Sequence, residues 1–164
     1  MRYNNTVRRK QKGRKTMTKK IWFDMDGTIA NLYAVEGWLE YLIAENVFPY
    51  SNAKVMLNFS LLARLLNKLQ ANGYEIGIIS WTSKNGSEMY NQAVEVTKKA
   101  WLAKHLPSVN WNTIKVVKYG TNKYMTCGGG ILFDDEEGNR SAWQDEAYEP
   151  SQILEILKRL IKEG

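Results

Sequence analysis

The sequence predicts an α/β protein in which helices cover both faces of an open, mostly parallel β-sheet. Three short apolar runs, at 21–23, 76–79 and 131–133, have the length and the isoleucine content of buried strands. Segments with the helical spacing of apolar side chains lie between and after these runs, and such alternation is typical of parallel sheets. Ligands of such sheets bind at the carboxyl ends of the strands.

The elements are expected in a simple order along the chain. Strands are expected at about 19–25, 75–80, 113–119, 131–133 and 147–148. Helices are expected at about 29–48, 59–72, 87–104, 139–144 and 151–162, with loops at 49–58 and 120–130. In the helix over 87–104, the predicted core face consists of Met89, Ala93, Val96 and Ala100.

Length and composition favour one globular domain. The chain has 164 residues, of which 44% are hydrophobic and 24% charged. No segment holds the run of about 18 apolar residues that a membrane helix needs. Cys127 is the only cysteine, which excludes an internal disulfide, so we expect a cytoplasmic protein that does not bind membranes.

The basic charge of the chain is concentrated at its N-terminus. The formal net charge is +6, and residues 1–16 contain seven Lys and Arg but no acid, which leaves −1 for the rest. We expect 1–18 to be a disordered basic extension, because it has few apolar residues. Met17 as the natural start and an arm that contacts nucleic-acid phosphates both remain open.

Two pairs of acids follow predicted strands. Asp24 and Asp26 come directly after the first strand, and Asp134 and Asp135 after the strand over 131–133. Parallel strands bring these ends to one edge of the sheet. Carboxylates so close repel one another unless a cation neutralises them or a proton is shared. Carboxylate oxygens suit Mg²⁺, which also binds substrate phosphate.

Hydroxyl and ammonium groups are expected at the same edge. Ser80 ends the second core strand and Thr82 follows it, while Lys118 and Lys123 precede the second acidic pair. These groups would hold phosphate oxygens and stabilise their charge. The inventory therefore predicts a site for phosphoryl transfer.

This arrangement closely resembles the haloacid dehalogenase-like (HAD-like) superfamily, whose fold is a three-layer, Rossmann-like open parallel sheet. The resemblance covers about 20–160. Its first motif, D-x-D-G-T, is matched by 24–28, and its acidic pair by 134–135. Its serine or threonine motif is matched by Ser80, with Thr82 as a second candidate. Lys123 is eleven residues before Asp134, a spacing similar to that of 5′-deoxyribonucleotidase-like members, whereas Lys118 is sixteen before it.

The resemblance implies a role for each matched residue. Asp24 would be the nucleophile that forms an aspartyl-phosphate, and Asp26 the general acid and base. Mg²⁺ would be bound by Asp24, the backbone carbonyl of Asp26, Asp134 and Asp135. Gly27 and Thr28 would provide the turn and its backbone donors. Ser80 or Thr82 would hold phosphate, and Lys123 or Lys118 would supply the lysine of the third motif.

The segment that would select the substrate is short. Residues 30–58 leave room for a small helical cap inserted into a domain that spans 19–164. Tyr33, Trp38, Tyr41 and Trp81 could stack on a nucleobase, although core packing would explain them equally well. We therefore expect a Mg²⁺-dependent phosphatase for nucleotides or other small phosphorylated metabolites. A polynucleotide-end phosphatase and a non-catalytic HAD-like binding protein are the alternatives.

Overall fold

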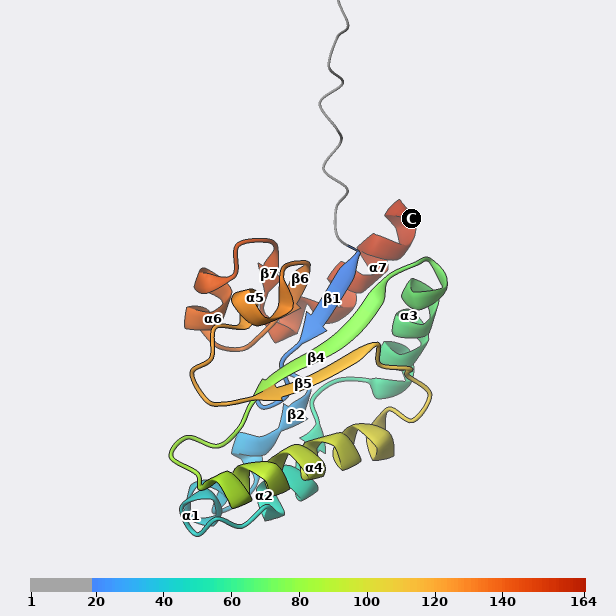
Figure 1. The fold of residues 1–164 in the computed structure, drawn as a ribbon. Coiled ribbons are helices and arrows are strands. Elements are labelled where there is room, and N and C mark those ends of the chain that lie inside the picture. Colours follow the sequence, from blue (N-terminus) through green and yellow to red (C-terminus); the bar gives the residue numbers. More distant parts are fainter. Residues whose placement is uncertain (1–18) are drawn as a thin grey trace, which may run out of the picture.

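The computed structural model describes residues 19–164, so the predictions for 1–18 lie outside the described residues. A five-stranded sheet lies at the centre of the molecule, with helices on both of its faces (Figure 1). Its strands are β1 (Lys20–Phe23), β4 (Glu75–Trp81), β5 (Thr113–Val117), β6 (Ile131–Phe133) and β7 (Ala147–Tyr148).

The order of the strands is β5-β4-β1-β6-β7, and every neighbouring pair is parallel. Counted along the chain, these core strands have the order 3-2-1-4-5, which is the doubly wound order of Rossmann-like sheets. The chain adds strands on one side of β1 and then returns to its other side. The predicted three-layer α/β fold with an open parallel sheet is thus confirmed.

The two faces of the sheet are covered by different helices because side chains alternate along each strand. Ile21 and Phe23 of β1 face the larger core, together with buried side chains of α3 (Phe59–Ala71), α7 (Ile153–Glu163) and the C-terminal part of α4 (Glu88–His105). Trp22 faces the opposite side, where it packs with Leu132, with residues of the short helix α5 (Lys123–Cys127) and with Trp143, which directly follows the short helix α6 (Glu137–Ala142). The 3₁₀ helix η2 (Pro150–Gln152) precedes α7.

Between β1 and α3, the structure differs from the single helix that is predicted over 29–48. This segment contains β2 (Ala30–Asn31), the 3₁₀ helix η1 (Leu32–Ala34), α1 (Trp38–Ile43), α2 (Phe48–Asn52) and β3 (Lys54–Val55). Gly37 interrupts the helical spacing with a φ of +72°, a backbone conformation that favours glycine. Pro49 lies in the first turn of α2, where proline is tolerated, so the loop expected at 49–58 begins as a helix.

The predicted core face of α4 is wrong. Met89 and Val96 are 82% and 67% exposed. The buried residues of this helix are Tyr90, Val94, Lys98, Trp101 and Leu102. A shift of one residue turns a helical face by about 100°, and the larger side chains Tyr90 and Trp101 bury more area than the alanines on which the prediction depends.

The polar loop expected at 120–130 contains the helix α5. Asn122 caps this helix, because its side chain accepts a hydrogen bond of 2.9 Å from the backbone N–H of Met125. Gly128 ends it with a φ of +78°. The helix has too few turns to show an apolar period. Among residues 19–164, no helix is both long enough and apolar enough to cross a membrane.

Candidate active site

The turn after β1 places its acids at the switch point of the sheet, between β1 and β6. The backbone N–H of Asp24 donates to the carbonyl of Phe133 at 2.9 Å, which ties the ends of these two strands together. The carbonyl of Met25 then accepts from three successive backbone N–H groups, at 28–30. Gly27 lies within this turn at a φ of +78°. The chain therefore folds back tightly beside the carboxylates.

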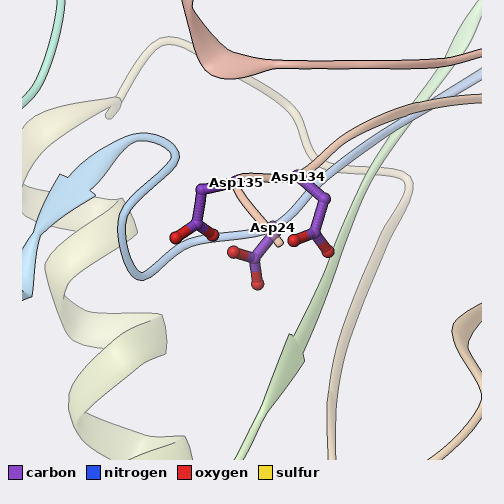
Figure 2. A group of neighbouring side chains, drawn as sticks. All are labelled: Asp24, Asp134 and Asp135. Atoms are coloured by element: carbon purple, nitrogen blue, oxygen red, sulfur yellow. The ribbon is translucent and has the colours of Figure 1, made fainter. Parts of the chain in front are cut away.

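Three carboxylates meet at this point. Oxygen atoms of Asp24, Asp134 and Asp135 all lie within 4.8 Å of one another. Figure 2 shows that the three side chains leave two different segments and gather around a common space. The hydroxyl of Thr28 donates to Asp24 at 3.0 Å, lies 3.3 Å from Asp135 and accepts the Asp135 backbone N–H at 3.2 Å. Thr28 thereby fixes two of the three acids.

Lys123 of α5 brings a positive charge into the cluster. Its ammonium lies 2.9 Å from Asp24 and 2.6 Å from Asp134, and the residue is only 5% exposed. Burial acts to lower the pKa of Lys123, but the charges of Asp24 and Asp134 outweigh it and raise that pKa above its ordinary value. Lys123 is therefore charged, and it joins the acids that follow β1 and β6.

One ammonium does not balance three acids. Burial, and then the charge of Asp24, raise the pKa of Asp134 to about 6 and that of Asp135 to about 8. Such raised values indicate that the ionised cluster lacks positive charge. The candidate ligand atoms of the group are all carboxylate oxygens, with no histidine or thiolate among them. The residues thus fit a hard divalent cation such as Mg²⁺.

Asp26 extends from the same turn toward a different lysine. Lys98 of α4 donates to the Asp26 carboxylate at 2.8 Å. Burial raises the pKa of Asp26, and Lys98 opposes that effect. Lys98 is absent from the residues that the motifs predict. The signal for it is the spacing of Tyr90, Val94 and Trp101, which places Lys98 in the middle of an otherwise apolar helix face.

The two hydroxyl candidates occupy different positions. Ser80 is fully buried, its oxygen accepts a hydrogen bond of 2.7 Å from Lys98, and it does not line the cleft above the carboxylates. Thr82 lines that cleft, and its buried hydroxyl oxygen has no hydrogen-bond partner among the described residues. Of the two lysine candidates, Lys118 is exposed and does not line the cleft, whereas Lys123 does.

The cleft above the carboxylates has a volume of about 470 Å³ and lies between the strand ends and the segment over 30–55. Two aromatic pairs line it. Tyr33 packs edge-on against Trp38, and Trp81 packs against Tyr119, each with ring centroids 4.9 Å apart. Tyr41 instead stacks on Phe48 and does not line the cleft. Three of the four predicted aromatic side chains thus border the cleft.

Comparisons with known proteins give little beyond this geometry. No family model matches the chain, and no curated protein matches it. Among solved structures, the chain is similar to D,D-heptose 1,7-bisphosphate phosphatase from Burkholderia thailandensis, with 16% sequence identity and a TM-score of 0.46. The match covers 75% of this chain and 70% of that chain. A likeness at this level defines neither the family nor the activity of the chain.

Because Gly27 lies close to Asp135, a side chain at position 27 is expected to affect metal binding. A Cβ at Gly27 would lie 2.3 Å from the Asp135 carboxylate. We expect Gly27→Ala to displace Asp135 and weaken Mg²⁺ binding about tenfold or more, as changes to groups that support metal ligands do. Isothermal titration calorimetry measures this affinity.

Gly73→Ala is the matched control, because Gly73 also has a positive φ but nothing lies within 4 Å of its Cβ position. Both substitutions cost about 1–2 kcal/mol in backbone strain. Equal Mg²⁺ affinity in the two variants would show that Asp135 does not need the space at Gly27.

The raised pKa values predict how stability depends on pH without metal. Asp134 and Asp135, with a pKa of about 6 and of about 8, bind protons more tightly in the folded state than in the unfolded chain. Between the ordinary carboxyl pKa, near 4, and these values, the folded state holds more protons. The free energy of unfolding therefore falls as the pH rises from about 4 to 8.

Thermal melts in EDTA at pH 5 and pH 8 measure this effect, and Mg²⁺ should reduce the fall. Asp135→Asn should flatten the curve between pH 6 and 8, since it removes the group with the higher pKa. His105, whose pKa is lowered by burial, contributes equally to both proteins and cancels in the comparison. A melting temperature in EDTA that does not fall between pH 5 and pH 8 would contradict the raised pKa values of Asp134 and Asp135.

Proposed function

We propose that this protein is a Mg²⁺-dependent phosphomonoester hydrolase of the HAD-like superfamily that acts through an aspartyl-phosphate. The observation that carries the proposal is the buried bridge from Lys123 to Asp24 and Asp134, with Asp135 completing the carboxylate group. Lys123 pairs with two of these carboxylates, and the third lies beside them at the carboxyl ends of the strands, where parallel sheets bind their ligands. A site that binds phosphate and a cation explains this charge arrangement.

In the first half of the proposed reaction, a carboxylate oxygen of Asp24 attacks phosphorus. The bond between phosphorus and the leaving alcohol breaks, and the leaving oxygen takes the proton of the Asp26 carboxyl group. Burial raises the pKa of Asp26, which favours that protonated form. Lys123 and the Thr82 hydroxyl would bind non-bridging phosphate oxygens. Bound Mg²⁺, held by Asp24, the Asp26 carbonyl, Asp134 and Asp135, would neutralise phosphoryl charge.

In the second half, water attacks the phosphorus of the aspartyl-phosphate. The Asp26 carboxylate accepts a proton from that water as its oxygen bonds to phosphorus. The bond to Asp24 breaks, inorganic phosphate leaves, and both carboxyl groups return to their initial states. Asp26 therefore acts as an acid in one step and as a base in the other. Its carboxyl group must lie within reach of both the leaving alcohol oxygen and the attacking water oxygen.

The cleft supports nucleotides as the substrate class. Tyr33 and Tyr119, which are 45% and 42% exposed, present aromatic surface beside the phosphate site. Aromatic rings bind planar bases through stacking. We propose that the segment over 30–58 serves as a small cap and that a nucleoside monophosphate places its base among these rings.

The enzyme proposal predicts Mg²⁺-dependent hydrolysis in a substrate panel of nucleotides, sugar phosphates, phosphorylated oligonucleotides and an aryl phosphate. EDTA should stop the reaction, and nucleoside monophosphates should give the highest kcat/KM. Asp24→Asn should lower kcat by at least about 1000-fold, as the loss of a nucleophile does in other enzymes.

Glu137→Gln makes the same carboxylate-to-amide change at an exposed position of α6 and serves as the control. Phosphate release is measured together with melting temperature, which shows whether each variant is folded. An active Asp24→Asn variant would exclude the aspartyl-phosphate route. A wild-type protein that binds Mg²⁺ but hydrolyses nothing in the panel would favour the non-catalytic alternative.

A polynucleotide end is the second candidate substrate, favoured by the basic residues at 1–16. If these residues contact phosphates, a chain that lacks them should bind a single-stranded oligonucleotide more weakly and with less dependence on salt. Fluorescence anisotropy at several salt concentrations measures both properties. Equal binding by the full and shortened chains would exclude the arm.

A further inference from the structure

Lys98 joins groups from two neighbouring strands beneath the cleft. Its ammonium donates to Asp26 after β1 at 2.8 Å, and to the Ser80 hydroxyl and the Trp81 carbonyl at the end of β4, both at 2.7 Å. A lysine ammonium has three donors, so these bonds use all of them. The residue is 1% exposed, which makes it one of the most deeply buried charged groups among the described residues.

Stability alone is a poor explanation for this lysine. A buried ion pair loses hydration on both partners, and an apolar side chain of similar volume is often as stable or more stable. The neighbouring buried positions on α4, such as Val94 and Leu102, are apolar. The charge of Lys98 therefore interrupts a largely apolar face at a position from which the ammonium reaches Asp26.

The hydrogen bonds of Lys98 reach two segments that border the cleft, the turn after β1 and the end of β4. Asp26, whose side chain is 18% exposed, faces the cleft with one carboxylate oxygen fastened to Lys98. The Trp81 carbonyl directly precedes Thr82, whose hydroxyl lines the same cleft and has no hydrogen-bond partner within 19–164. The ammonium also lies 5.1 Å from the ring centre of Tyr50, a residue of α2. Lys98 thus contacts the turn, the strand end and the inserted segment at once.

We propose that Lys98 is a positioning residue that fastens Asp26 to the end of β4 and so keeps the proton-transferring carboxyl group beside Asp24. This inference rests on the proposed function. Lys98 touches no reacting atom in this scheme. It limits the rotation of the Asp26 side chain, and proton transfer depends steeply on the distance and direction between donor and acceptor.

The test compares two substrates that differ in their need for a proton donor. An alkyl phosphate has a poor leaving group that must be protonated as the bond to phosphorus breaks, whereas p-nitrophenyl phosphate has a good one. The variants are Lys98→Met, which keeps the length of the side chain, and Lys98→Arg, which keeps its charge but not its geometry. Lys99→Met is the control, since Lys99 is exposed on the same helix and pairs with Glu95, away from the cleft.

The informative constant is kcat/KM, because it reports on steps up to the formation of the aspartyl-phosphate. Lys98→Met should lower kcat/KM for the alkyl phosphate about 100-fold, the lower end of the effect of a general acid, and for p-nitrophenyl phosphate less than about fivefold. Lys98→Arg should show the same pattern with a smaller loss, and it provides the comparison if Lys98→Met does not fold. Lys99→Met should match the wild type with both substrates.

Rapid-quench kinetics provide a second measurement. Because Asp26 also activates water, Lys98→Met should release p-nitrophenol in a burst close to one equivalent of enzyme and then turn over slowly. In the Asp26→Asn background, Lys98→Met should cause little further loss of kcat/KM for the alkyl phosphate, since the group that it positions is gone.

Equal loss with both substrates in the folded variants would overturn the inference and assign Lys98 to general stability. A full additional loss in the Asp26→Asn background would also overturn it, because Lys98 would then act independently of Asp26. These results leave the phosphatase proposal intact as long as the wild-type protein is active. A wild-type protein without activity on either substrate would reject the phosphatase proposal and, with it, this role of Lys98.

Discussion

The buried ion pairs of Lys123 are the interaction on which the candidate site depends. Asp24 and Asp134 approach each other because the ends of β1 and β6 are tied by a backbone hydrogen bond. Without the ammonium between them, two buried carboxylates would repel each other, and breaking such a buried pair costs about 3–5 kcal/mol. Lys123 offsets this repulsion but does not pair with Asp135, whose pKa is raised by burial and by the charge of Asp24. That remaining negative charge is what a divalent cation would neutralise.

The order of the strands brings these charged groups together with other polar groups at one edge of the sheet. The doubly wound order places β1 at the centre, so that acids after β1 and β6 and polar groups after β4 meet at one edge. Each aspartate of the first motif contacts a different lysine. Lys123 contacts Asp24, and Lys98 contacts Asp26. Two aspartates that are one residue apart thereby have different surroundings, which is the condition for different chemical roles.

Much of this edge could be predicted from the sequence because its signals are local. Apolar runs that end on acids indicate strands and their functional ends, and the resemblance to the HAD-like superfamily favoured Lys123 over Lys118 by its spacing from Asp134. The same kind of signal did not separate Ser80 from Thr82, because Ser80 lies near the end of β4 and Thr82 comes directly after it. Only the structure shows that Ser80 is buried beneath Lys98 while Thr82 lines the cleft.

The features that the sequence did not predict depend on long-range contacts. Lys98 follows Asp26 by 72 positions, and only the packing of α4 against the sheet brings them together. The inserted segment combines a helix break at Gly37 with a helix start at Pro49, and apolar spacing alone reports neither event. Short helices such as α5 are determined by caps at Asn122 and Gly128, which are common residues in loops.

Chemical trapping of the phosphorylated enzyme tests the central claim most directly. The wild-type protein would be quenched during turnover with Mg²⁺ and a phosphomonoester, then treated with borohydride, which reduces an aspartyl-phosphate to homoserine. Mass spectrometry of the peptides should locate homoserine at position 24 and at no other aspartate. Turnover without any reduced aspartate, or reduction at a residue other than Asp24, would contradict the account.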